Sequence, residues 1–83
     1  MRNRKTARTI LSFVRRELLD GVAEDGDPLA DGYLDSLAIE QLVAFLEETF
    51  EITVEDEEIV DQNFLDIETL VAFVELKREG VRP

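Results

Sequence analysis

The chain has 83 residues, which is enough for one small domain with a modest core and too few for two domains. It contains no cysteine and no histidine, so disulfides, cysteine metal sites and Ser-His or Cys-His catalysis are excluded. Twenty acidic residues outnumber nine basic residues, for a net charge of −11. No segment has the roughly 20 apolar residues of a membrane span, and the apolar run at 9–14 is too short for a secretory signal. A cytoplasmic protein without membrane contact is therefore expected.

The charge is divided unevenly along the chain. Six basic residues lie among the first 16 residues and three lie in residues 77–82, so residues 17–76 contain no lysine or arginine. The same segment contains every acidic residue except Glu79. This distribution disfavours binding to nucleic acids and anionic membranes, and it favours basic protein surfaces. The alternative, that the acidic residues only keep a small protein in solution, stays open at this point.

The first helix is predicted by apolar residues with the spacing of one helical face: Ala7, Ile10, Leu11, Val14 and Leu18. Asp20-Gly21 is expected to end it, because glycine is favoured just past a helix end. Residues 21–35 contain three glycines and a proline, which predicts a long loop with a turn around residues 25–28. Three side chains are expected to anchor this loop to the core: Leu29, Tyr33 and Leu34.

The second helix is expected over residues 36–50. Five apolar residues with helical spacing predict its inward face: Ile39, Leu42, Val43, Leu46 and Phe50. The opposite face carries Leu37, Gln41, Ala44 and Glu48. Either Asp35 or Ser36 is suited to cap the start of this helix, because both side chains accept hydrogen bonds from backbone N–H groups.

The last third of the chain predicts a connector, a short helix and a final helix. Thr53 and Asp56 have the spacing of a capping box, which predicts a short helix over residues 56–62. Asp66 is expected to cap a final helix over residues 67–78.

Together these segments predict an all-α fold, because no segment has the sustained alternation of a strand. The expected architecture is a small four-helix bundle with three main helices and a short third helix. A helical domain is expected over residues 6–79, between a basic N-terminal tail at 1–5 and a C-terminal tail at 80–83.

Ser36 is the residue that most specifically points to chemistry. The aspartates of the preceding loop do not form a calcium-binding loop, because Ala30 and Ser36 occupy the positions that require glycine and glutamate. With no histidine or lysine near it in the sequence, Ser36 is not expected to be a self-activated nucleophile, although another enzyme can modify it. The chain is therefore not expected to be an enzyme, and a capping role for Ser36 remains the alternative.

The tripeptide Asp35-Ser36-Leu37, at the start of an acidic helix after a long glycine-containing loop, resembles the modification site of acyl carrier proteins. The resemblance continues through residues 47–50, residues 52–58 and Asn63-Phe64, and it extends from the first helix to about Lys77. It implies that a phosphopantetheinyl transferase uses Mg²⁺ to move 4′-phosphopantetheine from coenzyme A onto Ser36. The thiol of this cofactor then carries acyl or aminoacyl groups as thioesters, so the carrier itself needs no cysteine and catalyses nothing.

The resemblance also implies partners and a cargo site. The partners are a ligase that loads the acyl or aminoacyl group, and downstream acyltransferases or synthases, which dock basic patches onto the second helix of a monomeric carrier. The expected docking residues are Glu40, Gln41, Ala44, Glu47 and Glu48, with Leu37 as an apolar contact. A possible acyl pocket is expected from Phe50, Ile59 and Phe64, for which an ordinary place in the core is the alternative.

Two departures from the family pattern refine the expected pathway. Fatty-acid-type carriers often have acidic residues where this chain has Ala38 and Gln41. Peptidyl carriers more often have glycine before the serine, where this chain has Asp35. A free-standing carrier of a specialised pathway, of polyketide, nonribosomal peptide-like or D-alanyl type, is therefore favoured over the carrier of housekeeping fatty acid synthesis. The alternative function is an acidic helical interaction module, an adaptor or nucleic-acid mimic that binds a basic partner protein.

Overall fold

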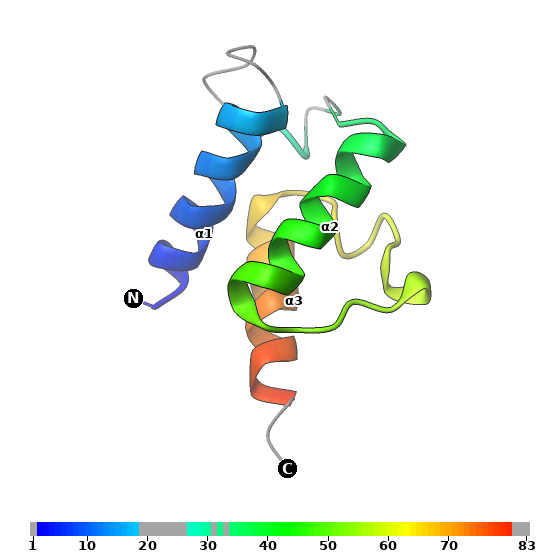
Figure 1. Cartoon of the computed structure of the whole chain (residues 1–83). Coiled ribbons are helices and arrows are strands. Elements are labelled where there is room, and N and C mark those ends of the chain that lie inside the picture. The colour runs from blue at the N-terminus through cyan, green and yellow to red at the C-terminus, as the bar shows by residue number, and fades with distance from the viewer. Residues whose placement is uncertain (1, 19–26, 31, 33, 81–83) are drawn as a thin grey trace.

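The computed structural model describes residues 2–18, 27–30, 32 and 34–80. All regular elements in this part of the chain are helical: α1 (Arg2–Phe13), α2 (Ser36–Phe50) and α3 (Ile67–Gly80), with a π-helical turn over Val14–Leu18 and a 3-10 turn over Asp56–Glu58. Figure 1 shows α2 crossing in front of α3, with α1 to their left and packed against α3. The expectation of an all-α fold is confirmed, and none of the helices described is long and apolar enough to cross a membrane.

The helix α1 places its predicted apolar face on the core. Ile10 and Val14 are fully buried, and the other three residues of that face pack partly buried against the same core. On the neighbouring side, the hydroxyl of the buried Thr6 donates a hydrogen bond to the carboxylate of Glu75 in α3. Because α1 begins at Arg2, residues 2–5 form its first turn instead of the expected tail. The predicted helix stop at residues 20–21 lies outside the described residues.

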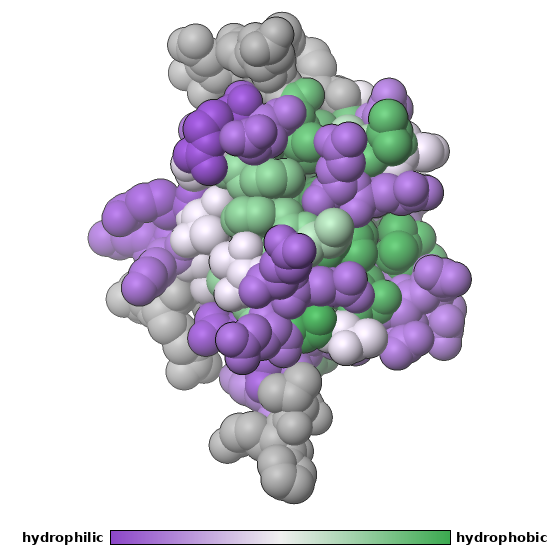
Figure 2. Space-filling view, viewed as in Figure 1, coloured by the Kyte–Doolittle hydropathy of each residue, from purple (hydrophilic) through white to green (hydrophobic). Residues whose placement is uncertain are grey.

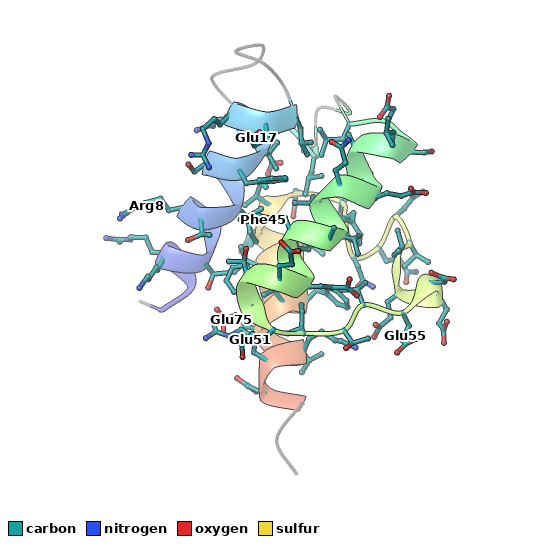
Figure 3. The ribbon with its side chains drawn as sticks, in the orientation of Figure 1. Arg8, Glu17, Phe45, Glu51, Glu55 and Glu75 are labelled. Atoms are coloured by element: carbon teal, nitrogen blue, oxygen red, sulfur yellow. The ribbon has the colours of Figure 1, made fainter. Side chains whose placement is uncertain are left out.

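The helix α2 has the two faces that its sequence predicts. Leu42, Val43 and Leu46 are buried, while Ile39 and Phe50 are partly buried against the core. All four residues predicted for the opposite face are exposed. The sequence pattern did not predict a further contact, in which Phe45 stacks on Phe13 of α1 with ring centroids 4.0 Å apart. Figure 3 shows Phe45 between the two helices.

The described part of the loop before α2 is anchored as expected at two positions. Leu29 is buried and Leu34 is partly buried, while Tyr33 lies outside the described residues. The N–H of Gly32 donates to the carbonyl of Leu29 at 3.2 Å and closes a turn. Gly32 has a φ of 76°, a conformation that glycine adopts without steric cost. The first part of the predicted turn, residues 25–26, also lies outside the described residues.

The connector between α2 and α3 differs from the prediction of a short helix over residues 56–62. It contains a single 3-10 turn, Asp56–Glu58, and the carboxylate that reaches back belongs to Glu58, which accepts the N–H of Glu55 at 2.9 Å. The predicted pair Thr53 and Asp56 therefore does not form the capping box. After Glu58 the chain turns again, with the N–H of Asn63 donating to the carbonyl of Val60 at 3.0 Å and its side-chain amide donating to the carbonyl of Glu58 at 2.8 Å.

The helix α3 is the central element of the core. Ile67, Leu70, Val71, Phe73 and Val74 are all buried, which agrees with the predicted apolar face. The predicted cap is confirmed, since Asp66 accepts the N–H of Thr69 at 2.7 Å. Figure 2 shows apolar surface between α1 and α2, and hydrophilic side chains over the outer side of α1.

Candidate functional site

The start of α2 is capped by Asp35. Its carboxylate accepts the N–H of Ala38 at 2.9 Å, and its carbonyl accepts the N–H of Ile39 at 2.9 Å. Asp35 has an extended backbone conformation, as N-cap residues do, while Ser36 is already the first helical residue. Of the two residues suited to this role, Asp35 performs it and Ser36 does not.

Ser36 is consequently available for another role. It is exposed, and in the described part of the chain its hydroxyl has no hydrogen-bond partner. The next residue, Leu37, is 63% exposed although it is a large apolar side chain. An exposed serine and an exposed leucine therefore follow each other at the start of α2, where Figure 2 shows apolar surface.

The backbone at this position is suited to an anion attached to Ser36. The first N–H groups of a helix have no intrahelical partners, and the helix dipole places partial positive charge at this end. The first turn of α2 contains no acidic residue, in contrast to α3, which has Glu68 in its first turn. Asp35 binds the N–H groups of Ala38 and Ile39, so a phosphate ester on the Ser36 hydroxyl would have the N–H groups of Ser36 and Leu37 within reach.

A cleft of about 500 Å³ opens beside Ser36. One wall is the start of α2 with Ile39, and the other is the connector with Ile59 and Phe64. Three carboxylates, Asp35, Glu40 and Asp61, also line the cleft, so its lining is both apolar and acidic. Two of the three residues predicted for an acyl pocket therefore line a cleft next to the predicted attachment site. The third residue, Phe50, does not line it and lies in a different cavity, where the guanidinium of Arg78 is 5.6 Å from its ring centroid.

The predicted docking residues lie on the outer face of α2, with one difference among them. Glu40, Gln41, Ala44 and Glu48 are exposed. Glu47 is partly buried, and its carboxylate accepts the N–H of Val54 at 3.0 Å. Glu47 therefore holds the connector against α2, and only part of its carboxylate is available to a partner.

Asp27 lies in the predicted turn of the loop, but its contact with α3 was not predicted from the sequence. One carboxylate oxygen of Asp27 accepts the N–H groups of Leu29 and Ala30, at 3.0 and 3.1 Å. The other oxygen accepts the N–H of Ile67, the first residue of α3, at 2.9 Å. An aspartate before a proline is a local signal for a turn, but nothing local indicates a contact with a residue 40 positions away.

Two carboxylates near the connector have altered acidities. A backbone hydrogen bond from Glu55, followed by a hydrogen bond from the Lys77 ammonium at 2.9 Å, lowers the pKa of Glu58. The pKa of Asp66 is lowered by hydrogen bonds from the hydroxyl and backbone N–H of Thr69. Both shifts arise from structural contacts of the connector and α3, and neither group lines the cleft at Ser36.

The described residues offer no group of three acidic side chains arranged to hold a metal ion. The features of the site are therefore an exposed serine at a helix start, an adjacent cleft lined by both apolar and acidic side chains, and an acidic outer helix face. Comparison of the sequence with models of known protein families and with curated proteins found no match.

Proposed function

We propose that the protein is a free-standing acyl or aminoacyl carrier whose Ser36 hydroxyl bears 4′-phosphopantetheine. One observation carries this proposal: Asp35 caps α2, so the adjacent serine is exposed and has no structural task among the described residues. A serine whose only role was helix capping would be expected to accept the hydrogen bond from the Ala38 N–H, which Asp35 accepts here.

The proposed attachment needs a partner enzyme. The Ser36 oxygen forms a bond to the phosphorus next to pantetheine in coenzyme A, and the bond from that phosphorus to the nucleotide breaks, releasing adenosine 3′,5′-bisphosphate. Because the chain has no histidine, and no lysine between residues 17 and 76, the base that takes the hydroxyl proton is assigned to the transferase. The transferase also supplies the Mg²⁺ site in this proposal.

The attached thiol would then hold the cargo as a thioester and present it to successive enzymes at high effective concentration. Three apolar side chains in the cleft beside Ser36, those of Ile39, Ile59 and Phe64, support a resting place for a short acyl chain. The 3-10 turn Asp56–Glu58 would take the place of the short third helix in a four-helix carrier bundle.

The outer face of α2 supports docking of enzymes with basic patches. Glu40 and Glu48 supply exposed charge, while Leu37 and Ala44 supply apolar contact area on the same exposed face. Contacts of this kind give fast, salt-sensitive association, which suits a carrier that has to leave each partner again. The loading ligase and the downstream acyltransferases or synthases are the partners proposed for this face.

Intact-protein mass spectrometry tests the proposal. The purified chain is incubated with coenzyme A, Mg²⁺ and a broad-specificity phosphopantetheinyl transferase, and we expect a gain of one phosphopantetheine group. Ser36→Ala should abolish the gain, whereas Ser12→Ala, which removes the other serine of the chain, should not affect it. Circular dichroism of both variants verifies that they remain helical. An unmodified wild-type chain after incubation with several transferases contradicts the proposal.

A further inference from the structure

The outer side of α1 carries a second surface that the proposed carrier function does not use. A shallow groove of about 720 Å³ runs along this side and is lined by Arg4, Arg8, Arg15 and Arg16, with Ala7 and Leu11 as its apolar part. We call these six residues the α1 basic face. Figure 3 shows Arg8 pointing away from α2 and α3.

Two of the four arginines of this face, Arg4 and Arg8, make no ion pair within the described part of the chain. The helix α1 itself contains no acidic residue. The ion pair of Arg16 with Glu17, at 3.2 Å, joins two exposed neighbours. Arginines four positions apart repel each other on a helix, so Arg4 and Arg8 weaken α1 unless an anionic group lies between them.

The surroundings of the α1 basic face favour a compact anionic partner over an extended one. The molecule measures 40 × 29 × 21 Å and has a net charge of −11, so a nucleic acid or a membrane surface that reached α1 would also face the acidic surface nearby. The strongly exposed large apolar residues in the described chain, Leu37, Val60, Leu65 and Leu76, all lie outside α1, so this helix has no side chain suited to insertion into lipid.

We propose that the α1 basic face binds an acidic helical segment of a partner protein. Carboxylates that recur every three or four residues on such a segment match the spacing of Arg4 and Arg8, and guanidinium groups bind carboxylates in a bidentate geometry. An alanine or another small apolar residue between the carboxylates lies on Ala7 and Leu11. Binding at the α1 basic face does not involve Ser36, which lies at the start of α2.

A labelled synthetic helical peptide with glutamate at every fourth position and alanine between is the probe, and its fluorescence anisotropy is measured against the full chain. We expect saturable binding that weakens as salt is added. Arg4→Glu combined with Arg8→Glu should raise the Kd by about tenfold or more, as expected for paired charges at an interface. Arg8→Glu and Lys5→Glu change the net charge equally, but Lys5 lines a different cavity, between α1, α2 and α3. The Lys5→Glu variant should therefore change the Kd by less than about twofold.

Several outcomes overturn this inference. These are an absence of peptide binding, equal weakening by Lys5→Glu and Arg8→Glu, and stronger binding to phosphatidylglycerol vesicles or a DNA duplex than to the peptide. A concentration-dependent dimer in sedimentation velocity that Arg8→Glu abolishes would instead assign the face to a second copy of the chain, and it also overturns the inference. Circular dichroism verifies that each variant is folded. Ser36→Ala should bind the peptide like the wild type, so this test fails or succeeds separately from the proposed carrier function.

Discussion

An aspartate caps the start of both α2 and α3, but the residue that follows the cap differs between the two helices. Asp35 and Asp66 each accept the N–H of the third residue after them, at 2.9 and 2.7 Å. The next residue is the exposed Ser36 in α2, but in α3 it is Ile67, which is only 7% exposed. The start of α3 is closed further by Asp27, whose carboxylate binds the N–H of Ile67.

The two helix starts therefore differ in how far the residue after the cap is buried and hydrogen-bonded. At α3 the cap, the loop aspartate and the buried isoleucine all contribute to folding. At α2 the cap alone contributes, and the hydroxyl beside it is free of hydrogen bonds within the described chain. The capping aspartate is therefore common to both helix starts, and the exposed Ser36 directly after it is what distinguishes α2 from α3.

The largest expected effect on the free energy of unfolding comes from replacing the residue after a cap, with a polar residue at Ile67 and an apolar one at Ser36. Ile67→Ser removes a buried side chain and places a hydroxyl in the core, so it should lower the free energy of unfolding by about 3 kcal/mol. Ser36→Ala removes an exposed hydroxyl without a partner and should change it by less than about 0.5 kcal/mol. Urea unfolding followed by circular dichroism measures both values. Similar losses for the two variants would contradict the contrast between the helix starts.

The next largest effect concerns the loop aspartate that closes α3. Asp27→Ala removes the acceptor for three backbone N–H groups and should lower the free energy of unfolding by about 1.5 kcal/mol. Asp61→Ala is the matched control, because Asp61 is exposed and its carboxylate makes no hydrogen bond to the described residues. Equal unfolding midpoints for the two variants would show that Asp27 does not hold the loop to α3.

A smaller effect is expected at the cap of α2. Asp35→Ala should cost about 1 kcal/mol, because the N–H of Ala38 loses its acceptor, whereas Asp35→Asn should cost less because asparagine also caps helices. Thermal unfolding by circular dichroism compares the two variants. If Asp35→Ala is as stable as the wild type, Ser36 takes over as the cap. The serine would then have a structural role, which would contradict the contrast between the two helix starts.

The smallest effect is a pH dependence at the cap of α3. Since the pKa of Asp66 is lowered in the folded state, its contribution to stability is complete above its ordinary pKa and is lost as the pH falls through the lowered value. Asp66→Asn keeps a capping side chain but does not titrate. The Tm of the wild type should therefore exceed that of Asp66→Asn at neutral pH, and the difference should shrink in acid. A difference that is constant with pH would contradict this explanation.

The sequence allowed prediction of those features that depend on residues close together in the chain. The helical faces of α1, α2 and α3 follow from apolar spacing, and the cap at Asp66 follows from local chemistry. Contacts between distant segments were not predictable in this way. The stacking of Phe13 on Phe45 and the bond from Ile67 to Asp27 depend on how the helices pack.

The connector shows why a local pattern can also mislead. Thr53 and Asp56 have capping-box spacing, but Val54 is buried and its N–H is bound by Glu47, which holds this part of the chain extended. The turn therefore begins later, at Asp56, and ends at Glu58. At the candidate site, Ser36 was singled out from the sequence and stays a prediction, whereas only the structure distinguished between Asp35 and Ser36 as the cap.

The most direct test of the carrier proposal is to locate the modification within the chain. After incubation with coenzyme A, Mg²⁺ and a phosphopantetheinyl transferase, the protein is digested, and the peptide that contains residue 36 is fragmented in a mass spectrometer. The proposal predicts a single phosphopantetheine group on Ser36, with the peptide containing Ser12 unchanged. An unmodified Ser36, or the same group attached at Ser12, would contradict it.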